Sequence, residues 1–392
     1  MPRIPNMTGS RLSHRPALDG VRGIAVLVVV MAHAQALIYG GPIFGWLDFS
    51  GGFLGVDIFF VLSGFLITSL LLEEYEIRGK ISLRNFYIRR ALRLLPALFL
   101  FLVAMIIYSR LALPAEIAQQ TVKFAAIAIL YITNWARAFE WIPGSQLLGH
   151  LWSLAVEEQF YLLWPPVLVL LFKLRISRRA LVLFVSALIA LVTILRVWLL
   201  IKGGISQGRI YLGSDTRADS LLVGCVAAML HTWQMLPSNR AIQYLLRMSP
   251  LISIPMFCLY FFDVFGIRSR SYFAYGLLVV ALCVAIVLLQ AMQKYKNPFL
   301  LVLENIVLAY VGRISYGLYL WHFFAIEASL RVPASNGVKL ALSFLTLFGI
   351  AAMSYYIIER PFLRLKKRFA ASTETSSKTR NIDCEFVTAE AS

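Results

Sequence analysis

Apolar stretches of roughly 20 residues alternate along the chain with short polar segments that are rich in lysine and arginine. A helix that crosses the hydrocarbon core of a bilayer needs about 20 mainly apolar residues, and about ten stretches reach that length. They are 22–39, 53–72, 91–109, 150–172, 180–201, 219–235, 249–265, 272–292, 314–330 and 338–358. A further apolar stretch, 119–133, is shorter, so we expect it to be re-entrant or interfacial. The pattern predicts an all-α polytopic membrane protein of about ten transmembrane helices plus this short segment.

The composition agrees with a membrane protein. Hydrophobic residues make up 59% of the 392 residues and charged residues only 15%, and the mean hydropathy is +0.75. A soluble domain with so few charges could not cover its surface. The net charge of +17 would indicate nucleic acid in a soluble protein, but here the basic residues flank the apolar stretches, so we expect no nucleic-acid partner. The four cysteines are isolated, and neither a disulfide framework nor a metal site is predicted.

The positions of the basic residues predict the orientation. Most of the 37 lysines and arginines fall in segments that share one side if the N-terminus is inside. These segments are 1–22, 73–93, 173–179, 236–248, 293–313 and 359–392. Both termini are then cytoplasmic, with residues 1–17 as an N-terminal segment and 366–392 as a polar tail. Residues 11–34 also imitate a cleavable signal peptide, but the apolar run continues through Ile38, so we prefer a first span.

Four ionisable side chains lie within the predicted spans in the outer half of the membrane. His33 lies about 16 Å beyond Arg22 along the first helix. Asp57 lies near the outer end of the second span, and Glu157 and Glu158 enter with the stretch that starts at 150. Intramembrane ionisable residues are costly and usually functional. We expect His33 to act as a base, oriented by one of the two glutamates or by Asp57.

A basic segment precedes the third span. Arg89 and Arg93 share a helix face by their spacing, Arg90 lies beside them, and Arg22 ends on the same side of the membrane. Guanidinium groups at this density suit a ligand with several phosphates, such as a nucleotide or coenzyme A. Anchoring of the span is the simpler alternative.

Other polar and aromatic residues are candidates for acceptor binding. Asp215, Arg217 and Asp219 cluster at the outer mouth of the sixth span, where they either contact acceptor hydroxyls or form a salt-bridged loop. Trp152 and Tyr161 could stack on a sugar ring. His322 lies within a later span beside Trp321, and a structural hydrogen bond is the preferred interpretation there.

Seven motifs in this order resemble the membrane-bound acyltransferase-3 family, the bacterial O-acyltransferases that modify surface glycans, nodulation factors and some macrolides. The motifs are LDGVRGIAVLVVVMAH, GVDIFFVLSGFLI, FYIRRALRLLP, HLWSLAVEEQFYLLWP, TRADSLLVGC, GRISYGLYLWH and IERPF. The resemblance implies an acyltransferase membrane domain over residues 18–365, in the bacterial inner membrane. It also implies that His33 matches the family's essential histidine, Arg22 its preceding arginine, and Arg90 and Arg93 its R-x-x-R pair. Relatives often carry an SGNH domain, so we expect any such partner on another chain.

The implied reaction moves an acyl group, usually acetyl, from cytoplasmic acyl-CoA to a hydroxyl on the outer side. No permanently bound cofactor is expected, since acyl-CoA is a substrate. The pantetheine arm is about 15 to 20 Å long, comparable with the rise from Arg22 to His33, so we expect a passage between the arginines and the imidazole. His33 either takes the proton of the acceptor hydroxyl or forms an acyl-imidazole. The acceptor, the acyl length and the oligomeric state are not determined by the sequence.

Two functions are alternatives to the acylation of a glycan. A flippase or transporter of lipid-linked glycans would also need intramembrane charge, but it should show internal repeats with paired broken helices, which the sequence lacks. An acyltransferase acting on a small molecule such as a macrolide differs only in its acceptor.

Overall fold

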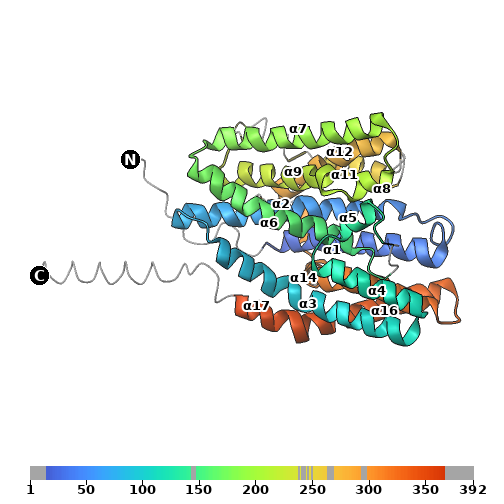
Figure 1. Cartoon of the computed structure of the whole chain (residues 1–392). Coiled ribbons are helices and arrows are strands. Elements are labelled where there is room, and N and C mark those ends of the chain that lie inside the picture. The colour runs from blue at the N-terminus through green and yellow to red at the C-terminus, as the bar shows by residue number, and fades with distance from the viewer. Residues whose placement is uncertain are drawn as a thin grey trace, which may run out of the picture.

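The computed structural model of this protein describes residues 15–142, 147–236, 250–262, 269–292 and 298–366, with a few isolated positions between 239 and 248. Helices form almost all of this part of the chain (Figure 1), which contains an isolated bridge between Ile43 and Leu47 but no strand. Seven helices there are long and apolar enough to cross a membrane. They span Pro16–Tyr39, Ser50–Arg78, Leu83–Ala112, Leu151–Lys173, Arg178–Lys202, Tyr272–Ala291 and Asn336–Leu365. The prediction of an all-α polytopic membrane protein is confirmed.

The elements follow one another with short connections. In chain order they are α1 (Pro16–Ala34), η1 (Gln35–Tyr39), η2 (Ser50–Phe53), α2 (Leu54–Arg78), α3 (Leu83–Ala112), α4 (Ala115–Ile129), α5 (Thr133–Ala138), α6 (Leu151–Lys173), α7 (Arg178–Lys202), α8 (Gln207–Leu212), α9 (Ser214–Thr232), α11 (Pro250–Phe261), η3 (Tyr272–Gly276), α12 (Leu277–Ala291), α13 (Pro298–Leu303), α14 (Ile306–Arg313), α15 (Ser315–Leu330), α16 (Asn336–Ser354), η4 (Tyr355–Glu359) and α17 (Arg360–Lys366).

Seven of the ten predicted spans coincide with the seven long apolar helices. The other three overlap α9, α15 and the 12-residue apolar helix α11, with position 249 and positions 263–265 outside the described residues. Polar residues occupy the first turns of α9, which lowers its hydropathy below that of the others. The number of ten spans therefore stays a prediction.

The short stretch 119–133 forms most of α4, a helix of 15 residues. At 1.5 Å per residue α4 is about 22 Å long, less than the roughly 30 Å of a hydrocarbon core. The chain then turns into α5, a helix of only six residues, before α6 begins. This length agrees with the prediction that the stretch is re-entrant or interfacial.

Small residues let the central helices approach closely. A Cβ atom on Gly64 of α2 would lie 1.9 Å from the Leu221 carbonyl oxygen of α9, and one on Gly224 of α9 would lie 2.0 Å from the Val61 oxygen of α2. On the other side of α2, a Cβ on Gly55 would lie 2.3 Å from the Ala25 oxygen of α1. Only glycine fits at these positions, so these residues allow the backbones of α1, α2 and α9 to pack closely.

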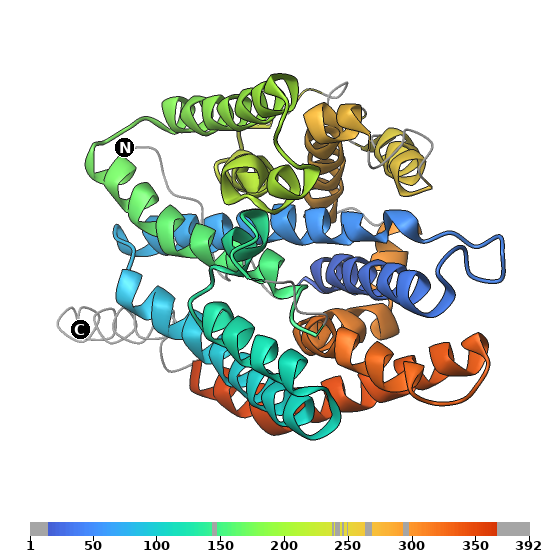
Figure 2. The same ribbon diagram turned by 45° about the vertical axis from the view of Figure 1, so that its right-hand side comes forward.

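The two ends of the bundle can be named by their connections. At the α2–α3 end, Tyr75 stacks on Phe172 with ring centroids 4.1 Å apart, and Arg178 of α7 pairs with Glu76 at 3.5 Å. The connections from α2 to α3 and from α6 to α7 therefore lie at the same end, as the predicted topology requires. At the opposite end, which we call the α1–α2 end, the loop between α1 and α2 projects from the bundle (Figure 2).

Candidate functional site

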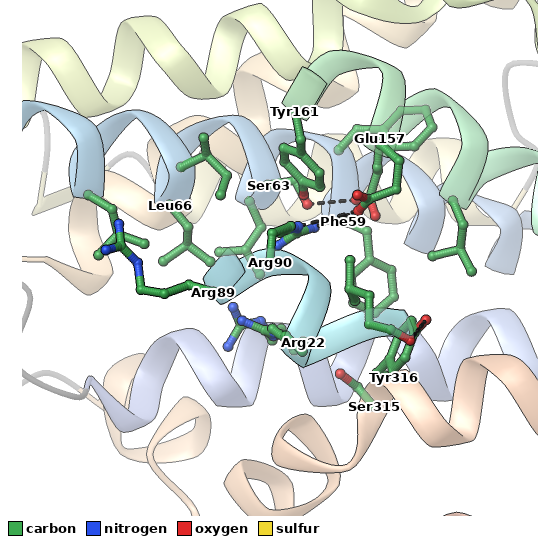
Figure 3. Close-up of a pocket in the computed structure, with 18 of the residues that line it drawn as sticks. Arg22, Phe59, Ser63, Leu66, Arg89, Arg90, Glu157, Tyr161, Ser315 and Tyr316 are labelled. Atoms are coloured by element: carbon green, nitrogen blue, oxygen red, sulfur yellow. Dashed lines mark hydrogen bonds and ion pairs between the residues drawn. The ribbon is translucent and has the colours of Figure 1, made fainter. Parts of the chain in front are cut away.

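A cavity of about 610 Å³ opens between α2, α3, α6 and α15. Four arginines line it, and for this reason we call it the arginine cavity; they are Arg22, Arg89, Arg90 and Arg93. Figure 3 shows Arg22, Arg89 and Arg90 beside Ser63, Glu157 and Tyr161. Its volume is typical of ligand pockets, which measure about 300–1,000 Å³. The expected basic cluster thus faces one cavity.

Three of the four arginines have carboxylate partners. Arg90 pairs with Glu158 at 3.1 Å and stacks on Tyr161, with its Cζ 3.6 Å from the ring centroid. Arg89 pairs with Glu74 at 3.0 Å, and Arg22 pairs with Asp19 at 3.0 Å. Arg93 has no carboxylate within ion-pair distance among the described residues. An incoming anion could therefore bind Arg93 without displacing a carboxylate.

The two glutamates of α6 face this cavity. Glu157 accepts a hydrogen bond from the Ser63 hydroxyl at 2.6 Å, and Glu158 accepts from Nε and Nη2 of Arg90. Both side chains line the arginine cavity, whereas His33 does not. The expectation that either glutamate orients His33 is not met, because their carboxylates bind groups on α2 and α3.

The cavity ends at a pair of hydroxyl groups. Ser153 of α6 and Tyr319 of α15 line its inner limit, and the two hydroxyls form a short hydrogen bond with each other. The Tyr319 hydroxyl also donates to the His150 carbonyl at 3.0 Å. We call these two residues the partition.

Three histidines gather on the far side of the partition. The His322 ring lies 5.0 Å from the His33 ring and 4.8 Å from the His150 ring, measured between centroids. The Tyr319 ring lies 5.5 Å from the rings of both His150 and His322. Tyr319 thus lies between the arginine cavity and the rings of His150 and His322. The expected open passage from the arginines to His33 is interrupted by Tyr319, which packs across it.

Backbone carbonyls fix the tautomer of each histidine. Nδ1 of His33 lies 2.9 Å from the Val29 oxygen, Nε2 of His150 lies 3.1 Å from the Leu320 oxygen, and Nδ1 of His322 lies 2.6 Å from the Tyr319 oxygen. A carbonyl oxygen only accepts hydrogen bonds, so in the neutral ring each of these nitrogens carries the proton. The other nitrogen of each ring is then a basic lone pair. Those of His150 and His322 are buried and have no hydrogen-bond partner.

The end of α1 holds His33 in a defined place. The helix widens into the π-helical turn η1 at Gln35, two residues after His33, and such a distortion is often found at functional sites. Gln35 in this turn donates to Asp48 at 2.7 Å and accepts from the Phe49 amide at 2.6 Å, which ties the turn to the following loop. The hydrogen bond from Gln35 lowers the pKa of the Asp48 carboxyl below its usual value.

Asp57 lies in a different cluster. It pairs with Arg217 of α9 at 2.7 Å, and a second pair joins Asp219 of α9 to Arg196 of α7 at 2.7 Å. All four side chains are fully buried. The expectation that Asp57 orients His33 is therefore not met, since its ion-pair partner is Arg217. Arg217 and Asp219 are equally out of reach of an acceptor.

The remaining acceptor candidates are only partly accessible. Asp215 is about one-third exposed and forms a two-pronged ion pair with Arg209 at 2.7 and 3.0 Å, which matches the alternative of a salt-bridged loop. Trp152 is buried against Phe60 and Tyr211. Tyr161 is buried beneath Arg90, in the arginine cavity. Neither aromatic ring is placed to stack on a sugar.

Several residues of this site are not among those predicted from the sequence. His150 and Tyr319 are absent from the predicted site, and His322 is predicted to have a structural role. Intramembrane histidines are a usable signal, since each is costly in hydrocarbon. Tyr319 has no comparable signal, because tyrosine is common in membrane helices. No group of three potential metal ligands occurs in the described part of the chain.

Comparisons with known proteins identify the family of this chain. The profile of a family described as "Acyltransferase domain" matches residues 15–359. A peptidoglycan O-acetyltransferase of Listeria monocytogenes is 32% identical over 362 residues, which are 88% of this chain and 55% of that protein. A putative peptidoglycan O-acetyltransferase of Bacillus subtilis is 34% identical over 361 residues, 88% and 54% of the two chains. The chain spans about half the length of these relatives, and no solved structure matches it significantly.

Proposed function

Because this chain belongs to the acyltransferase family whose profile spans residues 15–359, we propose that it is an integral-membrane O-acyltransferase that moves an acetyl group from acetyl-CoA to a hydroxyl of a glycan. The names of its relatives, peptidoglycan O-acetyltransferases, support a cell-wall or related surface glycan as the acceptor. The observation that carries the proposal is the arginine cavity, which ends one side chain away from a cluster of three histidines.

The arginine cavity is the proposed donor site. Its phosphate end is assigned to Arg93, with Arg22 beside it, because Arg93 has no carboxylate partner among the described residues. A phosphate at Arg89 or Arg90 would have to displace Glu74 or Glu158, which are already bound there. A guanidinium group binds phosphate through two parallel hydrogen bonds, which supports an arginine as the phosphate ligand. The basic α2–α3 end is then the cytoplasmic end by the positive-inside rule.

The pantetheine arm of the donor extends from the arginines toward the histidine cluster. It is about 15 to 20 Å long, close to the 16 Å rise between Arg22 and His33. To reach His33, the thioester has to pass Tyr319, and a rotation of this side chain away from Ser153 would open the way.

His33 is the proposed base. Its Nδ1 is bound to the Val29 carbonyl, so Nε2 is the nitrogen that can accept a proton from the acceptor hydroxyl. General base catalysis of this kind contributes about 10²–10⁴ in rate. A backbone carbonyl thus takes the orienting place that a carboxylate has in a serine-protease triad. Attack by Nε2 on the thioester, followed by transfer from an acyl-imidazole, uses the same nitrogen.

Proteoliposomes test the proposal. The purified protein is reconstituted, and vesicles with the α2–α3 end inward are selected by protease accessibility of a C-terminal tag. Isotope-labelled acetyl-CoA is enclosed and a cell-wall glycan fragment is added outside. We expect acetyl label on the external glycan and free coenzyme A inside, detected by mass spectrometry. If the glycan is labelled only when donor and acceptor are in the same compartment, transfer across the bilayer is contradicted. If the glycan is not labelled under any condition, acyl transfer to this glycan is contradicted.

A further inference from the structure

A cation lies beside the histidine cluster, on the short helix α5 that enters the bundle. Arg137 donates from Nη1 to the Gly149 carbonyl at 2.6 Å, one residue before His150. The guanidinium therefore lies at the start of α6, next to the residue that contributes His150 to the histidine cluster. It is half-buried, and no carboxylate forms an ion pair with it in the part of the chain that the structure describes.

The helix that carries Arg137 is held firmly. Thr133 donates to the Leu151 carbonyl of α6 at 3.0 Å. Asn134 donates to the Leu212 carbonyl at 3.2 Å and to the Ser214 hydroxyl at 3.0 Å, and it accepts from Gln159 at 2.9 Å. These bonds tie α5 to α6, α8 and α9, so Arg137 is fixed relative to His150. Groups that are held in this way can stabilise charge without reorganisation.

An unpaired arginine in this place lacks an anion. The two fully buried arginines Arg196 and Arg217 are paired with Asp219 and Asp57, whereas the half-buried Arg137 has no carboxylate partner among the described residues. Burial of a charge is costly unless it is paired. The Gly149 carbonyl occupies one N–H of the five that a guanidinium offers.

The histidine cluster in turn lacks a hydrogen-bond donor. Nδ1 of His150 and Nε2 of His322 are buried lone pairs without a partner, in side chains that are 3% and 0% exposed. A ligand that completes this region therefore brings both a hydrogen-bond donor and a negative charge. A hydroxyl that attacks a thioester has these two properties, since it releases a proton while the carbonyl oxygen becomes an oxyanion.

We propose that Arg137 binds the oxyanion of the tetrahedral intermediate during acyl transfer at His33. This inference rests on the proposed function, and it adds a catalytic residue to it. The step proceeds as follows. The acceptor oxygen forms a bond to the thioester carbon, its proton passes to Nε2 of His33, and the carbonyl electron pair moves onto the oxygen beside Arg137. The intermediate then collapses, the carbon–sulfur bond breaks, and the thiolate takes the proton from the imidazolium, which gives an ester and free thiol.

Three substitutions separate charge from anchoring. Arg137→Lys keeps the charge, Arg137→Gln keeps a donor for Gly149 without charge, and Arg137→Met keeps neither. We expect kcat of Arg137→Gln and Arg137→Met to fall about 10²–10³-fold, the loss typical for one oxyanion donor. The KM for acetyl-CoA should stay unchanged, because this interaction forms in the transition state. Arg137→Lys should retain more kcat than Arg137→Gln.

Arg331→Gln is the matched control. Arg331 also donates to a backbone carbonyl, that of Ala112 at 3.1 Å, but it is exposed, follows the last residue of α15 and pairs with Glu327 at 3.3 Å. Its substitution should leave kcat unchanged. Thermal stabilisation of each variant by coenzyme A shows that the donor site is folded. If Arg137→Gln does not fold, the test uses Arg137→Lys, whose kcat should stay within about tenfold of the wild-type value.

Three results would overturn the proposal. The first is a wild-type kcat in Arg137→Gln. The second is a kcat that is close to the wild-type value in Arg137→Gln but low in Arg137→Met, which would show that the residue only anchors Gly149. The third is an equal loss of kcat in Arg137→Lys and Arg137→Gln. Failure of the proposed function looks different, because His33→Ala would then retain transfer. If His33→Ala abolishes transfer and Arg137→Gln does not impair it, only the role of Arg137 is refuted.

Discussion

The Tyr319 hydroxyl donates a hydrogen bond to the His150 carbonyl at 3.0 Å and so ties α15 to α6 where the arginine cavity ends. The same phenol contacts the Ser153 hydroxyl. This link holds the partition closed between the proposed donor site and the histidine cluster. The protein therefore has a barrier of one side chain at the point where the thioester would cross.

Tyr319→Phe tests this barrier. The substitution removes both hydrogen bonds of the phenol while the ring remains, so the partition should open more often. We expect coenzyme A release without a glycan acceptor to rise, because water reaches the thioester more readily, while the KM for acetyl-CoA stays the same. Coupled thiol detection in nanodiscs measures the release. An unchanged or slower acceptor-free release would show that Tyr319 is not the barrier.

Arg93→Gln tests the phosphate assignment. Loss of a charge-assisted hydrogen bond costs about 1.5–3 kcal/mol, so the KM for acetyl-CoA should rise roughly 10- to 100-fold. S-acetylpantetheine lacks the distal phosphates, so its turnover should be unaffected by the substitution. Arg110→Gln, an exposed arginine on the same helix, is the control and should change neither substrate. Equal losses for both donors would contradict a phosphate role for Arg93.

Glu157→Gln tests whether this residue serves His33. The amide retains a hydrogen-bond acceptor for Ser63, and the structure shows no contact of Glu157 with the imidazole. We expect kcat and its pH profile to remain close to those of the wild type, well short of the 10²–10⁴-fold effect of general base catalysis. A large loss of kcat with a shifted pH profile would instead restore the carboxylate to the orienting role that the sequence predicted.

Asp57→Asn should destabilise the fold. It leaves Arg217 buried without its counter-ion, and breaking such a pair costs about 3–5 kcal/mol. The thermal midpoint in detergent should fall, and Asp57→Leu combined with Arg217→Met should recover part of the loss, since an apolar pair replaces both charges. A catalytic Asp57 would behave differently: activity would vanish in Asp57→Asn while the thermal midpoint stayed at its wild-type value.

The sequence predicted the helices better than it predicted their contacts. Apolar length located the long helices and the short α4, because hydropathy is a local property of the chain. Depth counting placed His33, Asp57 and Glu157 in one half of the membrane, but depth does not determine which neighbouring helix each side chain faces. Asp57 faces α9 and Glu157 faces α2, and both directions follow from tertiary packing.

Partners on distant segments were equally hidden. Arg217 is predicted to lie at the outer mouth of the sixth span, yet it is buried against Asp57, 160 positions away in the chain. The histidine cluster joins residues from α1, α15 and the start of α6, and nothing in the spacing of any one of them indicates the other two. Single intramembrane histidines were visible in the sequence, whereas their association required the structure.

The most direct test is single-turnover transfer of labelled acetyl-CoA by His33→Ala and His33→Gln in nanodiscs, with coenzyme A binding measured on the same samples. We predict that both variants bind coenzyme A like the wild type, because the arginine cavity does not include His33, and that acetyl transfer falls at least about 10²-fold. Transfer at the wild-type rate by either variant would contradict a reaction that depends on this imidazole.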